Sequence, residues 1–283
     1  MDKMFPRTTV GGMSLSRMII GTNWLAGWSH RSVAADERIR AHHAHHESID
    51  PMLETFLRHG VDTIMAPFAQ TPPILESVRH TEEMLQKKMI LIDTPIINVD
   101  DTPQARREAE QTIRKSKELG ASFCLIHHSS AEQLVDKNKQ KIHRLDDYTK
   151  MIRDAGMIPG LSAHMPELIV YSDQNGYDVE TYIQIYNCMG FLMQVEIETV
   201  NSIIWNAKKP VMTIKSMAAG RCTPFVGLNF SWATLRDCDM VTVGCFEERE
   251  ALEDIEISMA ALERRAARLD LRRSPNQNQA AFG

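Results

Sequence analysis

Short apolar runs alternate with amphipathic stretches along most of the chain. The apolar runs have the length of strands, whereas the stretches between them repeat apolar residues with a helical period and often end at glycine. The pattern predicts strands at residues 17–23, 61–66, 88–93, 122–127, 157–162, 191–197, 210–215 and 240–243. It predicts helices at residues 50–59, 73–86, 102–119, 145–155, 179–188, 225–236 and 247–269.

This order of elements predicts a (β/α)₈ TIM barrel. Strands that alternate with helices form right-handed βαβ units with a parallel sheet, and eight such units close into a barrel. An open doubly wound sheet is the alternative, but no Gly-x-Gly-x-x-Gly turn follows the first strand. We expect a single barrel domain over residues 1–272, with a long loop at 24–49 after the first strand and a flexible tail at 273–283.

Composition and charge narrow the class of protein. The 283 residues are 43% apolar and 24% charged, which is typical of a globular protein and excludes a disordered or fibrous chain. The net charge of −5 favours neither nucleic acid nor an anionic membrane as a partner. The five cysteines form no Cys-x-x-Cys pair, and no apolar run could span a membrane. We therefore expect a cytoplasmic protein with a small-molecule substrate, which could form a homo-oligomer.

Polar side chains gather where the predicted strands end. In barrel enzymes the chemistry takes place at the carboxyl ends of the strands. Alternation along a strand places residues two apart on the same face. The candidate residues, in strand order, are Asp93; His127 and His128; Ser162 and His164; Gln194, Glu196 and Glu198; and Lys215.

Seven local segments, taken in order, resemble those of the aldo-keto reductases. The resemblance covers roughly residues 11–262 and implies a barrel whose fourth strand ends in a catalytic histidine, which is His127 here. Ser162 and Gln194 match positions that bind the nicotinamide amide in that family. The segments are residues 11–23, 60–64, 125–127, 160–164, 193–196, 216–220 and 241–244.

The departures from the family pattern bear directly on function. That family uses an Asp, a Tyr, a Lys and a His, and only His127 remains. Met65 stands at the Asp position, Asp93 stands at the Lys position, and residues 66–77 contain no tyrosine. Without the tyrosine, the family's general acid for a developing alkoxide is missing. Carboxylates soon after Gly244 also disfavour a 2′-phosphate, so ordinary NADPH-dependent reduction is not expected.

A metal site is the hypothesis that replaces NADPH-dependent reduction. Asp93, His127, His164 and Glu196 lie on four successive predicted strands and could face one centre. Mixed carboxylate and imidazole ligands suit Zn, Mn, Fe or Co. Such a metal would polarise a carbonyl or activate water, with Lys215 as an acid or base. Glu198 or His128 would serve as a base or orient a ligand.

We therefore interpret the chain as a metal-dependent enzyme of the isomerase, epimerase, lyase or hydrolase type. Its substrate would be a small sugar-like molecule or a keto acid. Two alternatives stay open. One is an atypical NAD(P)-dependent oxidoreductase, and the other is a catalytically inactive barrel that serves as a binding subunit. The simplest explanation of the polar cluster is that its members only bond one another.

The loop at residues 24–49 carries a second group of histidines. Four histidines lie within residues 42–46, where they could bind a transition metal or form a solvated turn. His42 and His46 would share a face of a helix. Trp24 and Trp28 could line a sugar-binding wall or simply cover the barrel mouth.

Overall fold

A closed barrel of parallel strands forms the centre of the structure, a computed structural model that describes residues 4–269. The strands follow one another round the barrel in chain order, and the last pairs with the first. The predicted (β/α)₈ barrel is therefore confirmed. The barrel strands are β3 (Met18–Gly21), β4 (Thr63–Ala66), β5 (Ile90–Asp93), β6 (Phe123–Ile126), β9 (Ile158–Ala163), β10 (Tyr182–Ile185), β11 (Val211–Ile214) and β12 (Met240–Gly244).

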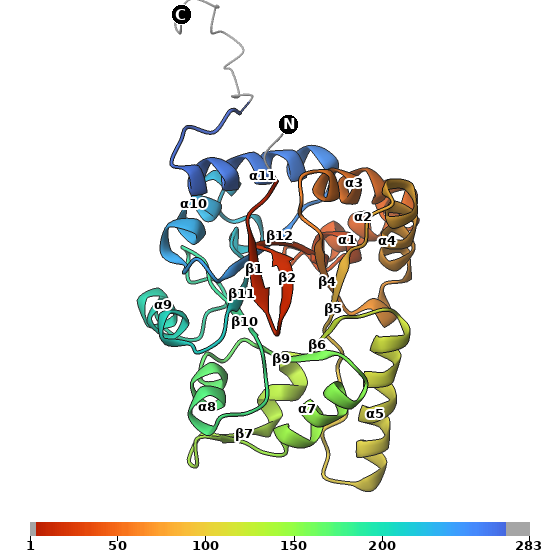
Figure 1. Cartoon of the computed structure of the whole chain (residues 1–283). Coiled ribbons are helices and arrows are strands. Elements are labelled where there is room, and N and C mark those ends of the chain that lie inside the picture. Colours follow the sequence, from red (N-terminus) through yellow and green to blue (C-terminus); the bar gives the residue numbers. More distant parts are fainter. Residues whose placement is uncertain (1–3, 270–283) are drawn as a thin grey trace, which may run out of the picture.

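Helices on the connections between strands cover the outside of the barrel (Figure 1). Local chemistry sets where they begin: at α5, Thr102 accepts the N–H of Ala105 at 3.1 Å and Pro103 occupies the first turn. The covering helices are α3 (Asp50–Arg58), α4 (Pro72–Leu85), α5 (Pro103–Glu118), α7 (Leu145–Asp154), α8 (Glu167–Asn175), α9 (Ile197–Asn206), α10 (Pro224–Thr234) and α11 (Glu248–Glu263). Shorter elements lie among them: α6 (His128–Ala131), η2 (Phe68–Gln70), η3 (Glu132–Leu134), η4 (Ala218–Gly220) and the hairpin of β7 (Val135–Asp136) and β8 (Lys141–Ile142).

The sixth barrel strand differs from the prediction. The pattern predicted a helix at 179–188 and a strand at 191–197, but the strand is β10, and residues 191–196 form an irregular loop before α9. Every residue of β10 is buried, so the strand shows no polar face. A short run that is buried on both faces can be mistaken for a helix, because periodicity does not separate the two.

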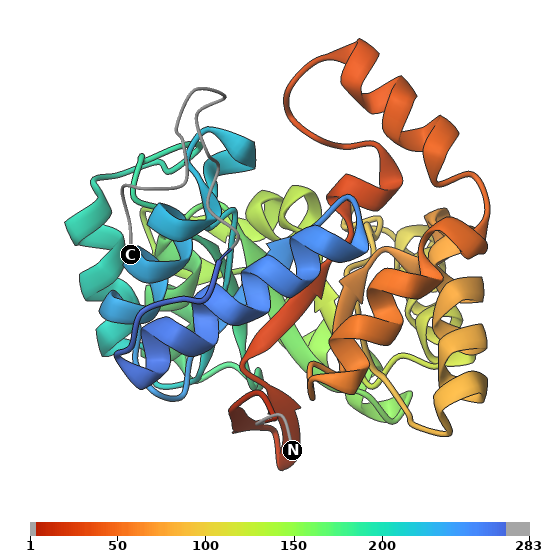
Figure 2. The same cartoon turned by 90° about the horizontal axis from the view of Figure 1, so that it is seen from above.

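Apolar side chains fill the barrel interior at its amino end. Ile19, Ile92, Phe123 and Met212 belong to an apolar cluster inside the barrel. The hairpin of β1 (Arg7–Val10) and β2 (Met13–Ser16) contributes Val10 and Leu15 to the same cluster. Figure 2 shows this hairpin at the end of the barrel near the N-terminus. It therefore fills the amino end of the barrel, and any site lies at the opposite end.

A long segment after β3 stands out at that opposite end (Figure 2, orange). We call residues 24–49 the lid segment. It contains most of α1 (Asn23–Ala26) and all of α2 (Val33–His42) and η1 (His46–Ser48). Ser32 caps α2 by accepting the N–H of Ala35 at 3.1 Å. The long loop expected after the first strand therefore has helical structure of its own.

Two further expectations concern the ends of the chain and the membrane. No helix within residues 4–269 is long and apolar enough to cross a bilayer. The tail expected at 273–283 lies outside the described residues.

Candidate functional site at the barrel mouth

A cavity of about 780 Å³ opens at the carboxyl ends of the strands. It is lined by the ends of most barrel strands, by the lid segment, by residues 214–224 after β11 and by the first turns of α11. The volume falls within the range of cavities that hold small molecules and cofactors. Its lining includes three histidines and one lysine, which we call the imidazole-rich region. It also includes four charged residues, Arg31, Arg221, Glu250 and Glu253, which we call the extension.

The imidazole-rich region contains three histidines from two strand ends. His127 and His128 follow β6, and His164 follows β9. The rings of His128 and His164 stack with centroids 3.7 Å apart, and those of His127 and His128 lie 4.2 Å apart. Nδ1 of His127 accepts the N–H of Ser129 at 3.3 Å. In the neutral ring the proton therefore lies on Nε2, which leaves a hydrogen-bond donor on the remaining ring nitrogen.

These histidines are uncharged at neutral pH. Burial, assisted by neighbouring His128 and Lys215, lowers the pKa of His127 to about 4. Burial together with His128 and Lys215 lowers the pKa of His164 to about 3. Neutral imidazoles can donate a hydrogen bond to a substrate oxygen without carrying charge.

Lys215 is a lysine of the cavity whose charge acts on all three histidines. Its backbone adopts the left-handed conformation, with φ at +62°. Ile214, the residue before it, also lines the cavity, so the unusual backbone lets two successive side chains reach the same space. Nζ of Lys215 lies 3.1 Å from Nε2 of His30 in the lid segment. Burial lowers the pKa of Lys215 from its ordinary value of 10.5, which suits a proton donor.

The extension of the cavity carries charges of both signs. Arg31 and Arg221 line it, and the guanidinium of Arg221 lies 3.9 Å above the ring of Phe191. Glu250 and Glu253 reach it from the first two turns of α11. One arm of Arg221 donates to the backbone oxygen of His30 at 3.2 Å, which ties the lid segment to the loop after β11.

Comparison with known proteins identifies the fold. No family model matches the chain, and no curated protein matches its sequence. Among solved structures, the Pseudomonas aeruginosa protein PA4992, described as an aldo-keto reductase, is 12% identical with a TM-score of 0.66, over 93% of this chain and 98% of that one. An aldo-keto reductase from Klebsiella pneumoniae in complex with NADPH is 14% identical with a TM-score of 0.60, over 94% and 92%. A Klebsiella pneumoniae aldo-keto reductase in complex with NADP and acetate has a TM-score of 0.56 at 13% identity, over 92% and 95%.

The chain has the fold of the aldo-keto reductases. The resemblance inferred from the seven segments is thereby confirmed at the level of the barrel. The identities are low, so the comparison concerns the fold alone, and the chemistry depends on the residues at the mouth of this aldo-keto-reductase-like barrel.

The metal-dependent interpretation is wrong. The structures most similar in fold include two with NADPH or NADP, which point away from a metal-dependent isomerase, lyase or hydrolase. The proposed ligands also fail to meet. His127 and His164 line the cavity, but Asp93 and Glu196 do not. A Zn, Mn, Fe or Co cofactor at this mouth is therefore withdrawn.

Asp93 faces away from the barrel interior. Its neighbour Ile92 belongs to the interior cluster, so the alternation of β5 directs Asp93 outward. There its carboxylate accepts the N–H of Phe68 at 3.0 Å and of Thr94 at 3.1 Å. Burial raises the pKa of Asp93, and these bonds oppose the rise. Its role is to hold the loop after β4.

The residues predicted on the sixth strand also lie elsewhere. Gln194 and Glu196 are exposed in the loop before α9, and Glu198 is exposed in its first turn. None of the three lines the cavity. The glutamine on the sixth strand is Gln184, which is fully buried in β10. The error follows from placing the strand about ten residues too late.

Five of the nine strand-end candidates line the cavity, as do Trp24 and Trp28 of the loop: the five are His127, His128, Ser162, His164 and Lys215. The pattern missed Thr242, Glu250 and Glu253, which also line it, and placed His30 only among the histidines of the loop after the first strand. Thr242 ends in a buried hydroxyl without a hydrogen-bond partner. Its place near the end of β12 was the available signal, whereas the position of His30 depends on how the lid segment folds back.

Proposed function

We propose that this chain is an NAD(H)-dependent oxidoreductase that reduces a small carbonyl compound at the barrel mouth. The observation that carries the proposal is the single cavity that joins neutral imidazoles and Lys215 to an extension with two arginines and two glutamates. One part has the groups needed to polarise and protonate a carbonyl oxygen. The other has the groups needed to hold a dinucleotide.

The extension fits the chemistry of a nicotinamide dinucleotide. Arginine guanidinium groups suit a pyrophosphate, and Arg31 and Arg221 both line the cavity. A carboxylate near a ribose accepts hydrogen bonds from its hydroxyls, and this role falls to Glu250 or Glu253. The unpartnered hydroxyl of Thr242 and the hydroxyl of Ser162 would serve the carboxamide. The residues present therefore fit the group.

A bound dinucleotide would supply a hydride to the carbonyl carbon. The Nε2–H of His127 would donate a hydrogen bond to the carbonyl oxygen and orient it. As negative charge grows on that oxygen, the ammonium of Lys215 would transfer a proton to it. Lys215 thus takes the role for which the related family uses a tyrosine. The low pKa of His127 and His164 keeps these rings from competing as cations for the same oxygen.

Tryptophan fluorescence tests the proposal. Trp24 and Trp28 line the cavity, whereas Trp205 lies on α9 away from it. We expect NADH to quench the fluorescence saturably, because a nucleotide in the cavity lies beside both indoles. Replacing Trp24 and Trp28 together with phenylalanine should remove most of the quenching, and the control Trp205→Phe should keep it. If calorimetry and fluorescence both detect no NADH binding, the proposal fails and an inactive barrel is left.

Charge in the extension should set the choice of nucleotide. A 2′-phosphate placed near Glu250 and Glu253 would meet two like charges. We expect the Glu253→Lys variant to improve the affinity for NADPH relative to NADH by about tenfold, since a charge reversal is worth roughly 1–2 kcal/mol near a surface. Glu118→Lys makes the same change on the far helix α5 and serves as the control for net charge. Equal ratios in both variants would place the ribose elsewhere.

A further inference from the structure

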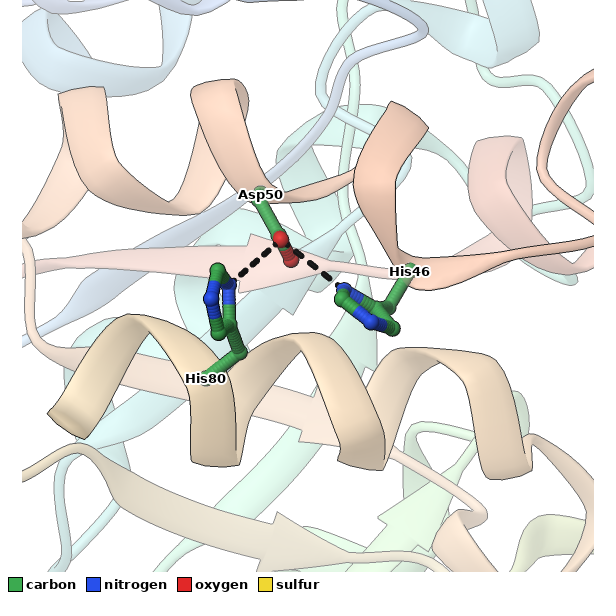
Figure 3. Close-up of side chains that lie close together, drawn as sticks. All are labelled: His46, Asp50 and His80. Carbon is green, nitrogen blue, oxygen red and sulfur yellow. Dashed lines mark hydrogen bonds and ion pairs between the residues drawn. The ribbon is translucent and has the colours of Figure 1, made fainter. Parts of the chain in front are cut away.

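His46, Asp50 and His80 form a compact cluster outside the barrel-mouth cavity (Figure 3). They come from three elements: His46 begins η1, Asp50 begins α3, and His80 lies on α4. One ligand atom from each lies within 4.8 Å of the others. Within residues 4–269 this is the one group of histidine, cysteine and acidic side chains with such spacing.

The two imidazoles converge on one carboxylate oxygen. Nδ1 of His46 lies 2.9 Å from Oδ2 of Asp50, and Nδ1 of His80 lies 2.7 Å from the same atom. The second oxygen, Oδ1, accepts the hydroxyl of Ser77 at 2.6 Å. Asp50 is 7% exposed, so its carboxylate is held from both sides in one orientation. A carboxylate fixed by an outer hydrogen bond is the usual arrangement of a metal ligand.

We propose that His46, Asp50 and His80 bind one divalent transition-metal ion of the Zn²⁺ type. Two imidazole nitrogens and one carboxylate oxygen form a donor set that suits Zn²⁺, with a water molecule as the fourth ligand. Tetrahedral ligands at roughly 2.1 Å from the metal lie roughly 3.4 Å apart. The two nitrogen–oxygen distances, 2.9 and 2.7 Å, must therefore open by roughly 0.5 and 0.7 Å. His80 has a half-exposed side chain and His46 is 29% exposed, so both can make this shift and leave the water position open.

The position of the cluster gives the ion a structural role. His46 lies at the end of the lid segment, and His80 lies on a helix that packs against the barrel. The neighbouring His42 and His43 are already occupied, because their rings pack on Phe246 with centroids 4.7 and 5.0 Å away. An ion on His46, Asp50 and His80 would fix the end of the lid segment to α4. It would not touch the reacting groups at the mouth.

Without a metal, the same three side chains make a hydrogen-bonded chain in which both imidazoles donate to Asp50. In the metal-bound state the ion takes the place of the two Nδ1 protons, and each neutral imidazole keeps its proton on Nε2. Hydrogen bonding alone does not bind zinc. Direct measurement of zinc binding therefore separates the two states.

The experiment uses tag-free, full-length protein freed of metal by chelator. We expect calorimetry to detect one Zn²⁺ per chain, and Co²⁺ to give the visible absorption of a four-coordinate site. Excess Zn²⁺ should raise the Tm by roughly 5 °C, since a ligand at 100 times its Kd stabilises the native state. His46→Ala and His80→Ala should each weaken Zn²⁺ binding at least tenfold.

His45→Ala is the matched control, because this exposed histidine belongs to the same tract and lies outside the cluster. It should bind Zn²⁺ as the parent does. Circular dichroism establishes that each variant is folded, and His80→Gln provides a second variant of similar size. Absence of stoichiometric Zn²⁺ binding to the parent, or unchanged binding in folded His80→Ala, would overturn the proposal. Neither result affects the NADH titration, which probes a separate cavity.

Discussion

Replacing Lys215 with methionine should lower kcat/KM for NADH-dependent carbonyl reduction by roughly 10²–10⁴-fold, the range for loss of a general acid. Lys215 is the cation beside the cavity histidines, and the ordinary acid of the related family is absent. Methionine keeps most of the length of the side chain but has no proton to donate. The measurement is the loss of NADH absorbance with pyruvate and 4-nitrobenzaldehyde as probe substrates.

The pH profile gives an independent readout of the same group. A proton donor acts in its protonated form, so activity is present below the pKa of Lys215 and is lost as the pH rises through it. Burial lowers this pKa, and the alkaline limb should therefore fall below 10.5. Lys87→Met, at an exposed position in the loop between α4 and β5, should leave both rate and profile unchanged. If Lys215→Met keeps the activity and the NADH affinity of the parent, another group must donate the proton to the carbonyl oxygen.

Replacing Asp239 with alanine should destabilise the fold by roughly 3–5 kcal/mol, the usual cost of leaving a buried charge without its partner. Asp239 is fully buried at the amino end of β12. Oδ1 accepts the N–H of Val211 at 2.9 Å and Nη2 of Arg236 at 2.8 Å. Oδ2 accepts the backbone N–H and Nε of Arg236 at 3.0 and 2.9 Å. Alanine removes these four contacts, and that of the Cys238 thiol with Oδ1, and leaves the guanidinium without its carboxylate.

Urea unfolding followed by circular dichroism measures the effect. Asp237→Ala is the control, since this carboxylate is fully exposed and lies 3.8 Å from Arg17. Solvent screens a carboxylate that is fully exposed, and Arg17 keeps its hydrogen bonds to the backbone oxygens of Asp239 and Arg236, so the control should stay near the parent. A loss below about 1 kcal/mol in Asp239→Ala would mean that the chain rearranges to pair Arg236 in another way.

The barrel could be predicted from the sequence because its strands and helices have distinct periods. The helix from Asp50 begins with a proline in the first turn, and its predicted range agrees with α3 to within one residue. The sixth strand could not be located in the same way. Tyr182 to Ile185 includes the polar Gln184, whereas residues 193–197 alternate apolar and polar positions as an exposed strand would. A strand that has helices on one side and the barrel interior on the other has no polar face to reveal it.

The candidate site was predictable where alternation along a strand continues to its end. Phe123 and Leu125 lie in the interior cluster, and His127, two residues on, lines the cavity. Asp93 directly follows an interior residue, so it faces outward. A difference of one residue along the strand decides whether a carboxylate points into the barrel or, as here, outward against the loop after β4. Lys215 breaks the alternation through its left-handed backbone, which no pattern of apolar residues encodes. The approach of His30 depends on the tertiary fold of the lid segment.

The hairpin that fills the amino end of the barrel has a kinetic consequence. Val10 and Leu15 occupy that end, so the proposed nucleotide and carbonyl compound would both have to enter from the mouth. With its carboxamide at Ser162 and Thr242, as proposed above, a nucleotide would place its reactive ring at the strand ends, and the smaller molecule would then lie between that ring and solvent. Binding would follow a compulsory order, with the nucleotide first to arrive and last to leave. In product-inhibition experiments, the oxidised nucleotide would then compete with the reduced nucleotide, and every other pair of product and substrate would give non-competitive or mixed inhibition.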